Sequence, residues 1–462
     1  MTILFDDDQF SSATLGVYST NSFFTRFKSA ADLSPADGDP YPSAVPTHVH
    51  EFIHYLHNIS TVAGVRAAVL VNTAVFMATQ YLMTESELIE KSSQETLQSK
   101  DVEFFLKHLN LIFGSFEKIE DCRDESIEDH WEISNLQSYD QNCFAHLFAY
   151  QLNIKGVIKK RAVHGVLKIG LNFITEGIAY EVEREVWQKN GIASGIIDDA
   201  TPIFPYLTYE PVVNYIVGRK TNQSERMKVG SAALMHYSPS QGFIEACLAL
   251  RKGGDSFDKY FKNSIKALKF YMDNAFEEEV DILREFYAHT DKLGEPFESY
   301  LMRIKSASQM RSTFPLVEEI FLQDSLTPSR FLEISSALAE RLIIQEKADG
   351  TAITDYHGNQ NGLASLPDEK ITWFIVLCSA IHFVKQHFTA DGGISKTKDL
   401  KNAICPFSGA CYVEFSEGNP DVCKKTPWRF KATKNVNKNG VCWYVAGIRS
   451  ITPESKKIAS MP

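Results

Sequence analysis

Hydrophobic residues recur at helical spacing along most of the chain. A helix with apolar residues on one face and charged residues on the other is expected over residues 165–188. A strongly apolar helix is expected over residues 371–388. A longer apolar run covers residues 59–83. Residues 14–20 instead alternate between apolar and smaller or polar residues. The last 60 residues combine aromatic and valine residues with turn residues. Both patterns are typical of short strands. The pattern predicts a mainly α fold of the α+β class.

The apolar run over residues 59–83 is long enough to cross a bilayer. It contains Arg66, Asn72 and Gln80, however, and it follows directly on the preceding helical segment. We therefore interpret it as a buried central helix and expect no membrane association. The first ten residues carry three aspartates where a signal peptide would be positively charged, and no apolar segment follows them. The expected location is cytoplasmic.

The 462-residue chain has a net charge of −11 at pH 7. A nucleic-acid-binding surface needs clustered Lys and Arg, so we expect no nucleic-acid partner. An acidic segment runs from Glu117 to Glu132. Solvated surface is its simplest interpretation, and a docking site for a basic regulatory protein is the alternative.

The sequence His50-Glu51-Phe52-Ile53-His54 carries the clearest chemical signal. Residues four apart lie on the same face of a helix, so the two histidines can bind one metal ion from one side. Glu51 lies beside them, where it can accept a proton from an attacking water. Thr47 is a plausible N-cap for this helix. A catalytic zinc site would need one more protein ligand and an open position for water.

A candidate third ligand is Glu176, in the segment Glu176-Gly177-Ile178-Ala179, which begins 122 positions after His54. With this segment the chain resembles the zincin metallopeptidases whose third ligand is a glutamate, the gluzincins. The resemblance implies one Zn²⁺ held by His50, His54 and Glu176, with Glu51 as general base. It also implies a zincin-like domain in which a small edge sheet from the N-terminal region lies near the metal-binding helix.

The three-histidine metzincin pattern is excluded. It would require Gly at position 57 and His at position 60, where this chain has His57 and Ser60. His57 is interpreted as a hydrogen-bonding or packing residue near the site, with direct ligation as the alternative.

Further residues lie at helical spacing from Glu176 or follow it in the chain, where gluzincins commonly supply a transition-state donor. Tyr180 and Glu183 share its helical face, and Glu181 is interpreted as surface charge. The candidates for the donor are Tyr206, Tyr209, His236 and Tyr237.

Four cysteines cluster near the C-terminus, namely Cys405, Cys411, Cys423 and Cys442. Such a group can form a structural zinc site, although the spacings lack Cys-x-x-Cys pairs. Buried thiols are the simpler interpretation and a second, structural Zn²⁺ is the alternative.

We expect three domains: a zincin-like metallopeptidase domain over residues 1–250, a helical domain over 251–400 and a small cysteine-containing module over 401–462. The expected activity is selective cleavage of a protein or peptide substrate. Two alternatives stay open. One is a helical iron protein of the di-iron or mononuclear type, because Glu51-x-x-His54 also has the spacing of carboxylate-bridged metal sites. The other is a scaffold that retains the motif without activity.

Overall fold

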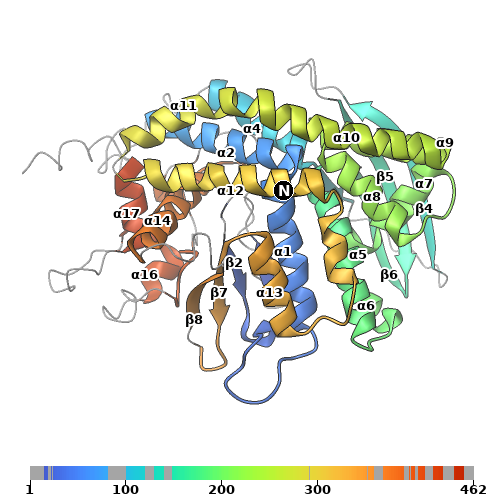
Figure 1. Ribbon diagram of the computed structural model, residues 1–462, viewed down its shortest axis with the longest axis horizontal. Coiled ribbons are helices and arrows are strands. Elements are labelled where there is room, and N and C mark those ends of the chain that lie inside the picture. Colours follow the sequence, from blue (N-terminus) through green and yellow to red (C-terminus); the bar gives the residue numbers. More distant parts are fainter. Residues whose placement is uncertain are drawn as a thin grey trace, which may run out of the picture.

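The computed structural model describes most of the chain. The described residues are 15–18, 22, 24–81, 100–119, 129–139, 148–290, 292–350, 352–357, 368–389, 395, 397–400, 404–410, 420–429 and 442–451. Within them the protein is mostly helical, with two small four-stranded sheets on either side of a central helix (Figure 1). The expected α+β class is confirmed.

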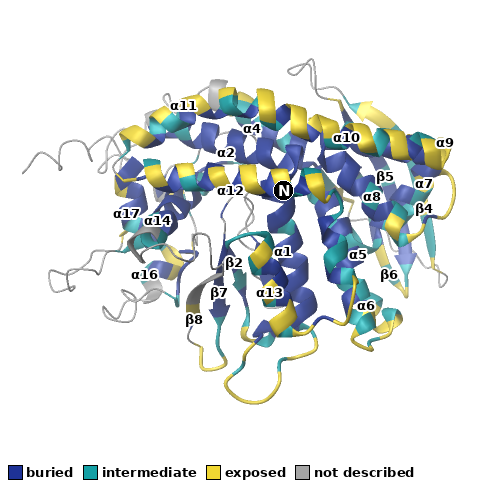
Figure 2. Ribbon diagram, viewed as in Figure 1, coloured by how far each residue is buried: buried dark blue, intermediate teal, exposed yellow. Residues whose placement is uncertain are grey.

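The central element is helix α1 (Ala44–Ser60), which is followed at once by α2 (Val62–Tyr81). Every residue of α1 is buried except His54. Figure 2 shows both helices in dark blue, enclosed by other elements. The segment Val62–Thr79 has the length and hydropathy of a membrane span, but 83% of it is buried inside the protein, as in a core helix.

Helix α1 begins three residues before the predicted N-cap Thr47. Ser43 is the N-cap, and its side chain makes no capping hydrogen bond. Pro46 lies in the first turn, where the missing backbone N–H leaves no helical hydrogen bond unmade.

The first sheet has the order β1-β2-β7-β8. Its strands are β1 (Gly16–Tyr18), β2 (Phe24–Phe27), β7 (Arg341–Glu346) and β8 (Ala352–His357). The β2–β7 pair is parallel, with Phe24 opposite Leu342, and the other two pairs are antiparallel. The short N-terminal strand β1 is at the edge of the sheet and contacts α1. This sheet combines strands from either side of residue 250, and the boundaries at 250 and 400 stay predictions.

The second sheet is antiparallel, with the order β3-β6-β5-β4. It follows helix α4 (Lys100–Phe113) and consists of β3 (Ser115–Lys118), β4 (His130–Tyr139), β5 (Ala149–Ile158) and β6 (Arg161–Lys168). The expected helix over residues 165–188 was therefore wrong at its start. Helix α5 begins only at Leu171, because the preceding residues complete β6.

Eleven further α-helices belong to the described part of the chain. They are α6 (Ser194–Ala200), α7 (Tyr209–Val217), α8 (Gln223–Leu234), α9 (Pro239–Lys252), α10 (Gly254–Asn274), α11 (Phe276–His289), α12 (Gly294–Thr313), α13 (Pro328–Leu338), α14 (Asp368–Lys385), α16 (Pro420–Lys425) and α17 (Trp443–Ile451). In Figure 1, α10 and α11 lie along the upper edge and α12 lies below them. Helix α11 contacts α2, and α12 contacts α1. The strands expected in the last 60 residues are absent from the part that is described, which forms turns and helices instead.

Candidate metal centre

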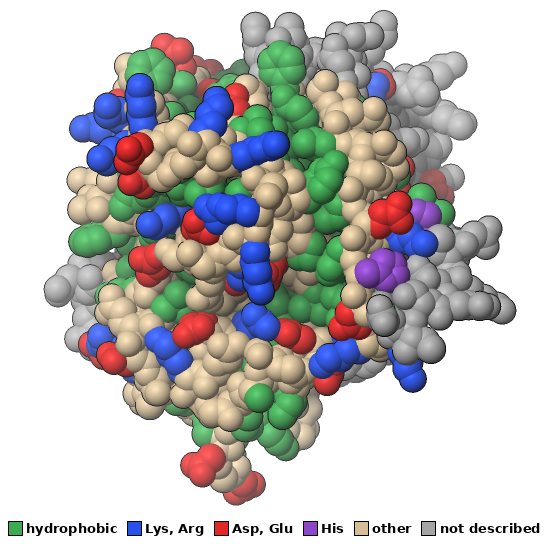
Figure 3. Space-filling view, turned by 90° about the vertical axis from the view of Figure 1, so that its right-hand side faces the viewer, with side chains coloured by type: hydrophobic (Ala, Val, Ile, Leu, Met, Phe, Trp, Pro, Cys, Tyr) green, Lys and Arg blue, Asp and Glu red, His purple; other side chains and the backbone are tan. Residues whose placement is uncertain are grey.

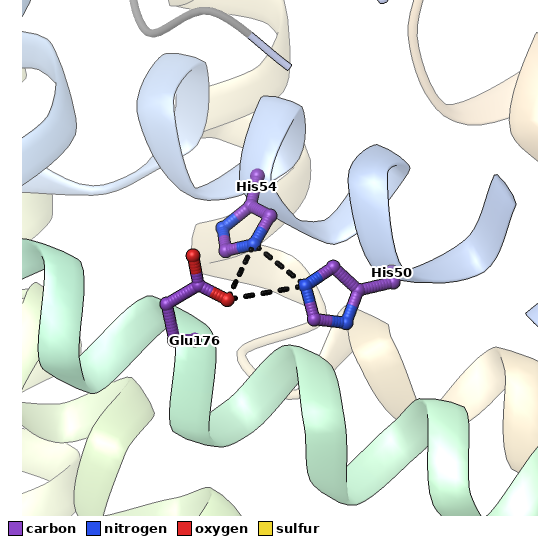
Figure 4. A group of neighbouring side chains, drawn as sticks. All are labelled: His50, His54 and Glu176. Carbon is purple, nitrogen blue, oxygen red and sulfur yellow. Dashed lines mark hydrogen bonds and ion pairs between the residues drawn. The ribbon is translucent and has the colours of Figure 1, made fainter. Parts of the chain in front are cut away.

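Three side chains from two helices converge on one point. His50 and His54 come from α1, and Glu176 comes from α5 (Leu171–Lys189), which packs against it (Figure 4). The two Nε2 atoms lie 3.0 Å apart, and Glu176 Oε2 lies 3.2 Å from each of them. In the described part of the chain, this is the only group of three or more His, Cys, Asp or Glu side chains with the spacing of a metal site.

The geometry and donor types fit a zinc ion. Zinc bonds of 2.0–2.2 Å in a tetrahedral arrangement hold ligand atoms roughly 3.4 Å apart, close to the three separations observed. Two imidazole nitrogens and one carboxylate oxygen are ordinary zinc ligands. The side chains of His54 and Glu176 are 14% and 28% exposed, so the group is open on that side. A further ligand can reach the same point from there.

Neighbouring histidines keep the Glu176 carboxylate ionised. Burial alone would raise its pKa, but the nearby imidazoles of His54 and His50 outweigh that effect and hold the pKa well below its usual range. The side chain is therefore ionised, as a metal ligand must be.

The small residue after Glu176 has a packing role. A Cβ atom on Gly177 would lie 2.1 Å from the Tyr209 ring, so only glycine lets α5 approach α7 this closely. Tyr209 is fully buried, and its hydroxyl donates a hydrogen bond to the Arg226 carbonyl. The tyrosine that was one of the candidate donors thus supports α5 from behind and does not face the metal group.

Glu183 fixes the orientation of His50. Its Oε2 lies 2.8 Å from His50 Nδ1, while the Trp187 indole N–H donates to its Oε1 at 3.3 Å. With Nδ1 held by the carboxylate, Nε2 is the nitrogen that points toward His54 and Glu176, and it can bind a metal ion once it has lost its hydrogen. Metal-binding histidines usually have such a partner, which also makes the imidazole a stronger ligand.

Glu51 is held against the edge strand. Its Oε2 accepts a hydrogen bond of 2.7 Å from the backbone N–H of Tyr18 in β1. Burial raises the pKa of Glu51, and the adjacent His50 and His54 partly oppose this change. Glu51 is not one of the three converging ligands. It therefore lies beside the metal group, next to strand β1.

Of the candidate donors, Tyr206 is the one that reaches the site. Its ring lies 5.7 Å from the His50 ring, centroid to centroid, and its hydroxyl is close enough to the Glu176 carboxylate to feel its charge. The charge of Glu176 is the main cause that raises its pKa well above the usual value, so the phenol stays protonated and can donate. Tyr206 lies in a short helical turn, Ile203–Leu207, whose Phe204 ring stacks on Phe116 of β3 at 4.1 Å.

The other candidates have different partners. The Tyr180 hydroxyl donates to Asp198 at 2.8 Å. His236, after the end of α8, hydrogen-bonds to Ser238 through Nδ1, and its Nε2 lies 4.0 Å from Glu245. The Tyr237 hydroxyl bonds to Glu279, and the Arg66 guanidinium covers its ring. All three side chains thus have partners other than the metal group.

His57 faces away from the metal group into a buried charged network. Its Nε2 lies 2.8 Å from Glu318 Oε1, and Arg311 donates to the same oxygen at 2.6 Å. Burial lowers the pKa of His57 to about 4, so the imidazole is neutral at pH 7. This network fastens the last turn of α1 to α12 and to the turn Val317–Leu322.

The interpretation of Glu181 as surface charge was wrong. The residue is buried and forms an ion pair with Arg226, whose Nη2 donates to Glu181 Oε2 at 2.9 Å. The partner lies 45 positions later in α8 and could not be paired with Glu181 from the sequence pattern.

The cysteines do not form a metal group within the described residues. The backbone N–H of Cys405 donates to the Cys423 carbonyl at 2.8 Å, so these two segments are adjacent. Cys411, the fourth member of the predicted group, lies outside the described residues. The prediction of a structural zinc therefore gains no support from this part of the chain.

No protein-family model, curated protein or solved structure matches the chain. What is established is a mostly helical protein with a His-His-Glu group that could hold a metal ion.

Proposed function

We propose that the protein is a zinc-dependent metallopeptidase that hydrolyses a protein or peptide substrate. The convergence of His50, His54 and Glu176, with donor atoms 3.0–3.2 Å apart, is the observation that carries the proposal. The position of Glu51 beside the two histidines on α1 adds the base that peptide hydrolysis needs.

A zinc ion bound by the three ligands would activate a water molecule and polarise the carbonyl of the bond to be cleaved. The protein's own side chains do the rest. Glu51 accepts the proton of the attacking water and can deliver it to the leaving amine. The Tyr206 ring lies 5.7 Å from the His50 ring, and its hydroxyl can turn to donate a hydrogen bond to the oxygen on which negative charge develops. Glu183 keeps Nε2 of His50 directed at the metal.

The edge strand offers a place for an extended substrate. Among the residues that the structure describes, β1 has β2 as its one neighbouring strand, and its Tyr18 N–H points at Glu51. Peptides commonly bind by adding a strand to such an edge. A substrate aligned there would lie next to the base, which supports a peptide substrate over a small molecule.

A mononuclear iron site is the second candidate, because two histidines and one carboxylate are also the ligands of many non-haem iron enzymes. The di-iron alternative has less support. It would need Glu51 as a ligand, whereas the Glu51 carboxylate accepts a hydrogen bond from Tyr18 and lies outside the converging group.

The test combines metal analysis with a search for substrates. The purified protein is expected to bind one zinc per site. Cell lysates incubated with wild type or with Glu51→Gln are compared for new peptide N-termini, with Glu185→Gln as a control on α5. Cleavage by the wild type and the control but not by Glu51→Gln supports the peptidase. Stoichiometric iron together with no Glu51-dependent cleavage would favour the iron enzyme, and no metal at all would favour a scaffold.

Selectivity is a further part of the proposal and is tested with casein. A selective enzyme should digest casein slowly while it cleaves few sites in the lysate, by substrate fit or by restraint from a regulatory partner. Rapid and broad digestion of casein would refute this part alone.

A further inference from the structure

A cavity of about 900 Å³ lies between strand β4 and helices α5 and α7. It belongs to the face of the molecule formed by the second sheet and α7, which Figure 3 shows with hydrophobic side chains between charged ones. Its volume is in the range of pockets that bind small ligands or single side chains of larger ones. None of the three metal ligands lines it.

The cavity adjoins the metal group through two elements. Tyr206 lines the cavity, and its ring also lies 5.7 Å from the ring of the metal ligand His50. Helix α5 supplies Tyr180 and Arg184 to the lining, four and eight residues after Glu176. At 1.5 Å per residue, these positions lie roughly 6 and 12 Å further along the helix than the metal ligand. A side chain next to a bond cleaved at the metal could therefore extend into the cavity.

Four aromatic side chains contribute to the wall. Trp131 from β4, Tyr180, Tyr206 and Tyr215 from α7 all line the cavity. The rings of Tyr180 and Tyr206 lie 5.4 Å apart. Aromatic faces bind alkyl chains by burial and bind cations through their π electrons.

The charges that line the cavity favour a cation. Five acidic and three basic side chains contribute to the lining, a difference of two negative charges. All three basic groups are already in ion pairs: Arg184 with Asp198, Arg219 with Glu225 and Lys159 with Asp199.

Three lining acids are left without a full counter-charge from a lining base, namely Asp129, Glu132 and Glu210. Glu210 lies 3.5 Å from Arg226, but that guanidinium is already bonded twice to Glu181. The cross-strand neighbour of Glu132, Lys155, is not part of the lining. The cavity therefore combines aromatic side chains with an excess of acidic over basic side chains in its lining.

We infer that this cavity is a specificity pocket for a basic side chain, lysine or arginine, of the peptide substrate. The inference rests on the proposed function for the nature of the ligand. The alkyl part of such a side chain would pack on the aromatic rings while its cationic end lies near Glu132 and Glu210.

Binding tests the pocket without any need for catalysis. Blocked alanine pentapeptides with a central lysine, norleucine or glutamate are titrated by calorimetry into full-length Glu51→Gln protein. The lysine peptide is expected to bind about tenfold more tightly than the norleucine peptide, and the glutamate peptide most weakly. Adding Glu132→Gln and Glu210→Gln should reduce the lysine preference to about twofold. The control protein carries Glu185→Gln and Glu278→Gln in place of these two substitutions, which removes the same charge outside the cavity. It should keep the roughly tenfold preference for the lysine peptide.

Equal affinity for lysine and norleucine, an unchanged preference after Glu132→Gln and Glu210→Gln, or no measurable binding of any pentapeptide would overturn the inference. Melting temperatures of the variants check that each is folded. If the lysine preference is present and depends on the two glutamates but no Glu51-dependent cleavage occurs, the pocket stands and the peptidase proposal fails. If Glu51-dependent cleavage occurs without any preference for a basic side chain, the peptidase proposal stands and the pocket inference fails.

Discussion

Replacement of Glu183 should weaken metal binding even though Glu183 is not a metal ligand. Its carboxylate accepts the His50 Nδ1–H at 2.8 Å, and the two side chains are only 20% and 8% exposed. A hydrogen bond between partly buried groups, one of them charged, holds the ring in place and increases its electron density. Glu183→Ala removes both effects and leaves the Nδ1–H without this acceptor.

The loss of such a partner typically costs 10–100-fold in metal affinity, or about 1.4–2.7 kcal/mol. We expect Glu183→Ala near the upper end, because the site is largely buried, and Glu183→Gln near the lower end, because the amide oxygen can still accept the hydrogen bond. Glu185→Ala, on the same helix and outside the site, should leave the affinity unchanged.

Competition with a chromophoric zinc chelator measures these affinities directly. Circular dichroism of each metal-free variant checks that α5 is intact. A change of less than about twofold for Glu183→Ala, with the helix intact, would refute the argument that Glu183 orients His50.

Two further predictions concern the scaffold. Gly177→Ala should lower the free energy of unfolding by about 1–3 kcal/mol in urea denaturation, because the new methyl group overlaps the Tyr209 ring. The control Gly254→Ala, whose methyl group would have nothing within 4 Å, should lower the free energy of unfolding far less. The metal-free protein should lose stability as the pH falls from about 6.5. Burial lowers the pKa of His57 to about 4. Burial would raise the pKa of Glu318, but the neighbouring Arg311 and His57 outweigh that effect and lower it to about 2. In both cases the unfolded chain binds the proton more readily than the folded protein does. The free energy of unfolding should therefore fall between about pH 6.5 and 4 because of His57, and below about pH 4.5 because of Glu318. Each titrating group contributes about 1.4 kcal/mol per pH unit. His57→Gln should flatten the decline between pH 6.5 and 4, and an unchanged slope in urea titrations would contradict the assignment.

The local part of the site was accessible from the sequence. Two histidines four apart share a helical face whatever surrounds them, so their convergence needs only that α1 be a helix. Glu176 required a resemblance to a known arrangement, because nothing local connects it to a helix 122 positions earlier. Tyr206 was one of four candidates and could not be singled out, since its position depends on Phe204 stacking against Phe116 from a distant strand.

The fold was predictable where periodicity was long and continuous. The buried helix α2 and the α14 helix were expected from their apolar runs. The second sheet was missed, because its strands are only partly buried and part of it falls in a segment that was interpreted as acidic surface. Glu181 shows the same limit. Its burial is compensated by Arg226, and a charged residue gives no sign in the sequence of a partner 45 positions away.

The most direct test of the central claim is zinc X-ray absorption spectroscopy of the purified protein, with zinc content measured in parallel. We expect one tightly bound zinc with nitrogen and oxygen ligands at about 2.0–2.1 Å and two imidazoles in the shell. His54→Ala and Glu176→Ala should each lose most of this zinc, and Glu51→Gln should retain it. A shell of sulfur ligands at about 2.3 Å, or full zinc content after His54→Ala, would place the metal elsewhere and contradict the account.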